Sequence, residues 1–116
     1  MRINVVIPAR YASTRFPGKP LVDIKGISMI QRVYLQASEA TLVDDVYVAT
    51  DDERIFKHVQ SFGGKVIYTS PLHESGTDRI AEAYTKMSVC DYIINVQGDE
   101  PFINPKQIDD LARLMI

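Results

Sequence analysis

The stretch INVVIPARYASTRFPGKPL (residues 3–21) decides the expected fold, because a short apolar run leads directly into a polar, cationic loop. The run Ile3–Ile7 has the length and β-branched content of a buried strand. The loop after it carries three cations, Arg10, Arg15 and Lys19, and no acidic residue. A buried strand that ends in such a loop is typical of the sheet edge at which α/β proteins bind ligands.

Three further strands are predicted from apolar runs at residues 45–50, 65–69 and 91–96. Between and after them, apolar residues recur at spacings of three and four, which indicates amphipathic helices. These helical patterns are Met29, Ile30, Val33, Tyr34 and Ala37; Ile55, Val59 and Phe62; Ile80, Ala83, Tyr84 and Met87; and Ile108, Leu111, Ala112 and Met115. The predicted order is β-α-β-α-β-α-β-α.

Helix ends are predicted from polar cap residues, a glycine pair and a proline at the first helical position. The signals are Ser28 with Gln31, Thr50 with Glu53, Gly63 with Gly64, and Asn104 with Pro105. Each lies at the edge of a helical pattern, so the two kinds of signal support the same elements.

Alternating strands and helices favour a parallel sheet with helices on both faces, because a parallel crossover needs a helix and right-handed connections cover both surfaces. We therefore expect an α/β fold, a three-layer sandwich with a mainly parallel sheet. Ligands in such folds bind beyond the carboxyl ends of the strands. This rule selects residues 8–20, 70–79 and 97–101 as the expected site.

The first of these loops has the chemistry of a phosphate site. Its cations Arg10, Arg15 and Lys19, with the hydroxyl groups of Ser13 and Thr14, can all turn toward one anion, and a triphosphate suits them. The loop is not a Walker A motif, because a proline follows Lys19. A solvated basic loop is the alternative, although cations without an acid repel one another unless an anion is present.

The loop QGDEP (residues 97–101) supplies a candidate metal ligand. Asp99 follows an apolar strand, and one carboxylate is enough to anchor Mg²⁺, which keeps several waters while it bridges to phosphates. Gly98 suits a close backbone approach that a side chain would block. A Gly-Asp turn closed by Pro101 is the better interpretation of this motif alone. Together with the cationic loop, the carboxylate indicates a metal–nucleotide site.

The third loop leads through Ser75, Gly76 and Thr77 into a predicted helix. Capping of that helix by Ser75 or Thr77 is the favoured interpretation. In the functional alternative, Gly76 makes room for a base or ribose, and Ser75, Thr77 or Arg79 hydrogen-bonds it. His73 is expected to be an ordinary surface residue, because no Ser/His/Asp arrangement is visible.

Composition narrows the classes of protein further. The chain has 116 residues, 46% of them hydrophobic and 24% charged, which is enough for one domain. A net charge of −2 gives no reason to expect nucleic acid or an anionic membrane as a partner. Cys90 is the only cysteine, which excludes an internal disulfide and suits a reducing compartment. The N-terminal apolar run is too short for a signal peptide or membrane span, so we expect a cytoplasmic protein.

The motifs VVIPARYASTRFPGKPL, VATDD, HESGTDRIAEA and NVQGDEPFI, in this order, resemble those of the 3-deoxy-manno-octulosonate (Kdo) cytidylyltransferases, or CMP-Kdo synthetases. The resemblance covers nearly the whole chain. It implies a Rossmann-like fold of the nucleotide-diphospho-sugar transferase type. It also implies transfer of CMP from CTP to Kdo, giving CMP-Kdo and pyrophosphate for lipopolysaccharide synthesis, with magnesium as cofactor and a homodimer as the assembly.

The resemblance also implies roles for individual residues. Arg10 and Lys19 match cations that hold the triphosphate, and Asp99 matches a magnesium ligand, so these three are the expected catalytic residues. The expected nucleotide-binding residues are Ala9, Arg10, Ser13, Thr14, Arg15, Lys19, Ser75, Gly76, Thr77, Arg79 and Gln97.

Members of that family are longer than this chain. We therefore expect residues 1–116 to be the nucleotide-binding part of a single α/β domain that is truncated at the C-terminus. The resemblance implies that the remainder supplies a second metal ligand, much of the Kdo pocket and most of the dimer contact. The alternatives are another sugar nucleotidyltransferase, such as the CMP-sialic acid type, and a catalytically inactive nucleotide-binding fragment.

Overall fold

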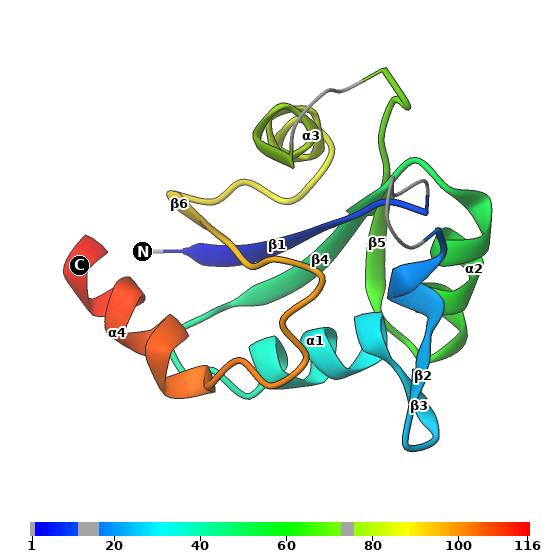
Figure 1. Ribbon diagram of the computed structural model, residues 1–116. Helices are drawn as coiled ribbons and strands as arrows, with labels where there is room; N and C mark the ends of the chain where they lie inside the picture. Colours follow the sequence, from blue (N-terminus) through cyan, green and yellow to red (C-terminus); the bar gives the residue numbers. More distant parts are fainter. Residues whose placement is uncertain (1, 12–16, 73–75) are drawn as a thin grey trace.

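The computed structural model describes residues 2–11, 17–72 and 76–116, and its architecture is a parallel sheet between helices (Figure 1). The main sheet has the order β5-β4-β1-β6, and every pair in it is parallel. Its strands are β1 (Ile3–Ala9), β4 (Asp45–Thr50), β5 (Lys65–Tyr68) and β6 (Tyr92–Asn95). The helices are α1 (Met29–Ser38), α2 (Glu53–Ser61), α3 (Gly76–Tyr84) and α4 (Pro105–Met115).

Helices cover both faces of the sheet. Successive side chains of β1 point to opposite faces, so apolar side chains of β1 pack against helices on each face. Val5 and Ile7 belong to a large buried cluster that also contains Ile30 of α1 and side chains of α2 and α4. Val6 belongs to a second cluster on the other face, with Ala83 of α3. Figure 1 shows α3 on the opposite side of the sheet from α1. The predicted α/β three-layer sandwich is confirmed.

Three of the predicted helix ends are confirmed. The Ser28 side chain accepts a hydrogen bond from the N–H of Gln31 at the start of α1. The Asn104 side chain accepts from the N–H of Lys106 before α4. Gly63 has a φ of +81° just after the end of α2, a conformation in which a side chain is strained.

The predicted capping box at Thr50 is wrong, because β4 continues through Thr50. The cap of α2 is instead Asp52, whose Oδ1 accepts hydrogen bonds from the N–H groups of Arg54 (2.9 Å) and Ile55 (3.1 Å). Pairing with β1 and β5 keeps Thr50 in β4, so α2 is capped two residues later than predicted, at Asp52.

Two further features differ from the sequence prediction. The helix α3 ends at Tyr84, so Met87 lies beyond it, although Met87 still packs against the cluster around Val6. A hairpin of β2 (Asp23–Ile24) and β3 (Ile27–Ser28) was not predicted, and it projects below the sheet in Figure 1. Its turn has positive φ at both central residues, which is the geometry of a tight hairpin turn.

Within residues 2–11, 17–72 and 76–116, no helix has the length and apolar character that crossing a membrane requires.

Candidate functional site

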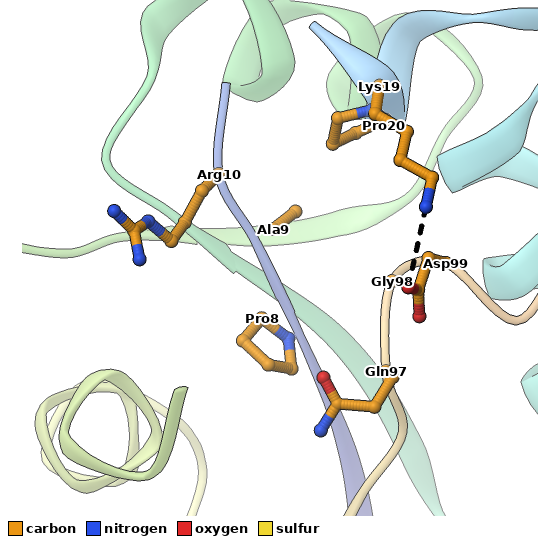
Figure 2. A pocket seen from close by; sticks show the side chains of 8 residues that line it. All are labelled: Pro8, Ala9, Arg10, Lys19, Pro20, Gln97, Gly98 and Asp99. Carbon is orange, nitrogen blue, oxygen red and sulfur yellow. Dashed lines mark ion pairs between the residues drawn. The ribbon is translucent and has the colours of Figure 1, made fainter. Parts of the chain in front are cut away.

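A pocket of about 290 Å³ lies at the carboxyl edge of the sheet, where β1 ends beside the loop that follows β6 (Figure 2). The adjacent short helix η1 (Lys19–Leu21) supplies one wall. The lining residues are Pro8, Ala9, Arg10, Lys19, Pro20, Gln97, Gly98 and Asp99. Because β1 and β6 are paired neighbours, two of the loops that the sequence selects meet in this pocket.

Lys19 and Asp99 form the polar centre of the pocket. Nζ of Lys19 lies 3.5 Å from Oδ2 of Asp99, and Figure 2 marks this ion pair. The two side chains are 42% and 55% exposed, so the pair adds little to stability. An accessible ammonium beside an accessible carboxylate can instead bind a phosphate and a cation that are themselves in contact.

Gly98 brings Asp99 close to β1. A Cβ atom at Gly98 would lie 3.0 Å from the carbonyl oxygen of Pro8 and 3.7 Å from Cγ2 of Ile7. The first distance is shorter than an ordinary carbon–oxygen contact, so a side chain would push the loop away from the strand. The predicted close approach at this glycine is therefore confirmed.

Arg10 lines the same pocket but does not point at the Lys19–Asp99 pair. In Figure 2 its side chain extends to the other side of the end of β1. Arg10 and Lys19 thus stand on two sides of the strand end. An extended anion with several charged groups can contact both cations, whereas a single compact anion suits only one of them.

Gln97 and Ala9, two of the expected nucleotide-binding residues, also line the pocket. The Gln97 side chain extends across β1 near Pro8 in Figure 2. Ala9 is buried, so it shapes the floor of the pocket through its small size. The amide of Gln97 can both donate and accept hydrogen bonds, which suits recognition of a base or a sugar.

Arg79, another of the expected nucleotide-binding residues, is not among the residues that line this pocket, and its role in nucleotide binding stays a prediction. Its side chain is 1% exposed, and its Nη2 lies 3.4 Å from Oδ2 of Asp51. Nη1 donates to Oγ1 of Thr69 at 2.5 Å and to the carbonyl of Ser70 at 3.4 Å. A buried guanidinium needs hydrogen-bond partners, and these contacts supply them. The Arg79 side chain therefore links the segment that follows β4 to the segment that follows β5.

Two other predicted residues of the third loop, Gly76 and Thr77, are also absent from the pocket lining. Gly76 is the first residue of α3, and Thr77 is exposed beside it. Ser13, Thr14, Arg15 and Ser75 lie outside the described residues, as does His73. The roles of these residues in nucleotide binding therefore stay predictions.

The donor set at the pocket fits a magnesium ion that arrives with a phosphate ligand. Among the residues that the structure describes, no group of three or more His, Cys, Asp or Glu side chains is placed to hold a metal. Asp99 is the one carboxylate among the described residues that line the pocket. One carboxylate suits Mg²⁺, which retains waters and binds phosphate oxygens, and does not suit a closed structural metal site.

The sequence analysis gave no role to three residues that contact one another beyond the end of β1: Tyr11, Asp52 and Arg54. The Arg54 guanidinium carbon lies 3.2 Å from the centroid of the Tyr11 ring. The hydrogen bond from Arg54, together with the N–H of Ile55, holds the pKa of Asp52 below its usual value. No spacing in the sequence signals a contact between the end of β1 and the first turn of α2.

The parallel sheet, with cations and a carboxylate at its carboxyl edge, defines an α/β protein with a pocket at the strand ends whose charges suit a phosphate-containing ligand. Residues 4–115 match the family model described as Cytidylyltransferase. The chain belongs to the cytidylyltransferase family.

Two curated relatives make the similarity more specific. The 3-deoxy-manno-octulosonate cytidylyltransferase of Cytophaga hutchinsonii is 59% identical over 114 residues, which cover 97% of this chain and 46% of that protein. The protein of the same name from Vibrio parahaemolyticus is 58% identical over 114 residues, which cover 97% of this chain and 45% of the relative. The chain therefore spans slightly less than half the length of these relatives, and the resemblance found in its motifs is confirmed.

Solved structures agree with this assignment. A CMP:2-keto-3-deoxy-manno-octonic acid synthetase complexed with CTP matches 99% of this chain and 47% of its own, with a TM-score of 0.96 and 51% identity. A cytidylyltransferase from Leptospira borgpetersenii covers 98% of this chain and 48% of its own, with a TM-score of 0.84 at 24% identity. The second match shows the shared fold.

Proposed function

We propose that this chain carries the nucleotide-binding pocket of an enzyme that transfers CMP from CTP to Kdo, giving CMP-Kdo and pyrophosphate for lipopolysaccharide synthesis. The main structural support for this proposal is the ion pair between Lys19 and Asp99, whose Nζ and Oδ2 atoms lie 3.5 Å apart at the carboxyl edge of the sheet. Support for the substrates comes from relatives that are named for Kdo and from a similar structure that is complexed with CTP.

The proposed chemistry is an in-line displacement at the α-phosphorus of CTP. The anomeric hydroxyl oxygen of Kdo bonds to that phosphorus, the bond to the bridging oxygen of the β-phosphate breaks, and the hydroxyl proton is released. Arg10 and Lys19 bind the triphosphate and offset the charge that moves onto the pyrophosphate. The residues of this pocket thus act mainly by positioning the triphosphate and by electrostatic stabilisation.

Asp99 is the proposed magnesium ligand. When bound, Mg²⁺ would neutralise part of the triphosphate charge. The exposed carboxylate of Asp99 would hold the ion, and Lys19 beside it keeps that carboxylate at the pocket. The neighbouring acid, Glu100, is not among the lining residues, so among the described residues that line the pocket Asp99 is the one carboxylate.

The cytidine and the sugar acid are proposed to contact Gln97 and Ala9, with the third loop nearby. Ser13, Thr14 and Arg15 are proposed phosphate contacts, and Ser75, Gly76 and Thr77 are proposed contacts to the nucleoside. We propose that the full-length protein acts in the cytoplasm as a homodimer, without a nucleic-acid or membrane partner. Its charge of −2 and its single cysteine suit that setting.

The experiment that tests this function is pyrophosphate release by the purified protein with CTP, magnesium chloride and Kdo. Parallel reactions replace CTP with ATP, GTP or UTP, and replace Kdo with N-acetylneuraminate or a sugar 1-phosphate. Release only with CTP and Kdo supports the proposal. Pyrophosphate release with another nucleotide and sugar would show that the protein is a different sugar nucleotidyltransferase. Binding of CTP without pyrophosphate release from any substrate pair would show that the chain binds the nucleotide but does not turn it over.

A further inference from the structure

A stacked pair of side chains holds the end of β1 against α2, outside the pocket. The guanidinium of Arg54 lies over the Tyr11 ring, with 3.2 Å between its central carbon and the ring centroid. Nη2 of the same guanidinium lies 2.8 Å from Oδ2 of Asp52, the residue that caps α2. The cation is therefore held by an aromatic face and by a carboxylate that is itself fixed to the helix.

Tyr11 also contacts the start of η1. The N–H of Gly18 donates a hydrogen bond to the carbonyl of Tyr11 at 2.8 Å. A Cβ atom on Gly18 would lie 3.0 Å from Cε2 of the Tyr11 ring, and Gly18 has a φ of +76°. The ring thus packs directly on a residue whose backbone conformation favours glycine. These contacts join the end of β1 to the start of η1.

The two cations of the pocket are the immediate neighbours of these contacts in the chain. Arg10 precedes Tyr11, and Lys19 follows Gly18. Both cations line the pocket, and Lys19 reaches Asp99. A contact that fixes Tyr11 therefore fixes the backbone from which both cations extend.

We propose that Tyr11 and Arg54 are positioning residues for nucleotide binding, and we refer to them as the Tyr11–Arg54 stack. The stack holds Arg10 and Lys19 on the two sides of the β1 end before the triphosphate arrives. Neither residue of the stack is among those that line the pocket. Because the geometry is set during folding, less ordering has to be done on binding, and the affinity rises accordingly. This inference rests on the proposed function, since it takes CTP as the ligand.

The test measures the dissociation constant of CTP by calorimetry, with excess magnesium chloride. Tyr11→Leu and Arg54→Met remove the stack, and Tyr11→Phe keeps the ring. Lys57→Met is the matched control, because it removes another cation from the same helix, 71% exposed and paired with Glu53. Arg54 is 59% exposed, so its replacement leaves the core of the protein intact.

We expect Tyr11→Leu and Arg54→Met each to raise the dissociation constant about three- to tenfold, the range that corresponds to one lost cation–π contact. Tyr11→Phe and Lys57→Met should remain within about twofold of the parent protein, since neither removes the stack. The double variant Tyr11→Leu/Arg54→Met should bind no more weakly than the weaker single variant, because both changes remove one contact. Arg54→Met should melt at a lower temperature than Lys57→Met, because it also removes the hydrogen bonds to Asp52, so binding is measured well below both melting temperatures.

Lys19→Ala separates this inference from the proposed function. If the parent protein does not bind CTP, the proposed function fails and the inference fails with it. If the parent binds CTP and Lys19→Ala does not, while Tyr11→Leu and Arg54→Met bind like the parent, the stack has no positioning role and the nucleotide site stands. Additive losses in the double variant would also overturn the inference, because they would assign Arg54 a contact of its own with the nucleotide.

Discussion

At the scale of single residues, the accessible carboxylate of Asp99 is the group with the most specific proposed role. Replacing it by an amide, Asp99→Asn, keeps the shape but removes the charge that a magnesium ion needs. We expect magnesium-dependent pyrophosphate release to fall by about 100-fold or more, in line with the loss of electrostatic stabilisation at a phosphoryl centre. A coupled pyrophosphate assay over a range of magnesium concentrations measures the effect.

The matched control for that change is Glu100→Gln, which neutralises the adjacent acid. Its side chain is exposed and is absent from the lining of the pocket. Release should therefore stay close to that of the parent protein. Full turnover by Asp99→Asn at low magnesium would contradict the assignment of Asp99 as the metal ligand.

Gly98 is the second residue with a specific role, because its backbone lies too close to β1 for a side chain. In Gly98→Ala, the added Cβ would lie 3.0 Å from the carbonyl oxygen of Pro8, so the loop has to move away from β1 and carry Asp99 with it. We expect a loss of about 1–3 kcal/mol of unfolding free energy, the usual range for overpacking, together with weaker CTP binding. Urea denaturation and calorimetry measure the two effects.

Gly63→Ala separates strain from site geometry. Gly63 has a φ of +81°, but a Cβ there meets nothing within 4 Å, and it lies after α2, away from the pocket lining. The strained backbone should cost about 1 kcal/mol of stability and leave CTP affinity unchanged. Equal affinities for the Gly98→Ala and parent proteins would show that the close approach does not position Asp99.

At the scale of elements, α4 is tied to the loop after α1 by one buried carboxylate. Oδ2 of Asp109 accepts hydrogen bonds from the N–H and hydroxyl of Thr41, both at 3.0 Å, and Oδ1 accepts from the N–H of Leu42 at 2.8 Å. The N–H groups of Thr41 and Leu42 hold the pKa of Asp109 below its usual value. Packing of α4 thus depends on the ionised form of this side chain.

The pH dependence follows from the direction of that pKa. A carboxylate whose pKa is lower in the folded protein stabilises it at a pH above the unfolded pKa of about 4. The stabilisation is lost progressively as the pH falls through that value toward the lower pKa of the folded state. In urea titrations, the unfolding free energy should therefore fall below about pH 4 more steeply for the parent protein than for Asp109→Asn.

At neutral pH, Asp109→Asn should lose about 1–3 kcal/mol of unfolding free energy, because the amide places a donor where N–H groups need an acceptor. Asp110→Asn, on the same helix, is the control: its side chain is 57% exposed and pairs only at the surface with Arg113. Identical stabilities and pH profiles for Asp109→Asn and Asp110→Asn would contradict a structural role for Asp109.

At the scale of the whole molecule, the described sheet ends at β6, and apolar side chains are exposed beside that edge. Leu114 is 85% and Ile116 is 69% exposed at the end of α4, which packs against β6. An unpaired strand edge next to exposed apolar groups favours association of chains. We therefore expect concentration-dependent self-association, which sedimentation velocity measures.

Leu114→Lys should shift that association to higher protein concentration. Leu72→Lys is the matched control, since Leu72 is 86% exposed but follows β5, at the other edge of the sheet. If both substitutions change the sedimentation equally, general charge rather than the β6 edge controls association. A strictly monomeric parent protein would contradict the prediction outright.

The sequence by itself determined the strands of the main sheet, the helices α1 to α4 and the type of fold, but not the hairpin of β2 and β3. The β-branched runs at β1, β4, β5 and β6 and the three- and four-residue spacings of the helices are local patterns that need no knowledge of distant contacts. The caps at Ser28 and Asn104 are equally local. The chemical character of the pocket was also predictable, because carboxyl ends of parallel strands converge at one edge.

Only the tertiary structure decided which side chains meet there. The order β5-β4-β1-β6 puts the loop after β6 next to β1, and this brings Asp99 to Lys19. The same packing turns Arg79 inward to Asp51 and lays Arg54 over the ring of Tyr11. These contacts join segments that are distant in the chain, so they depend on strand order and side-chain packing, neither of which local periodicity encodes.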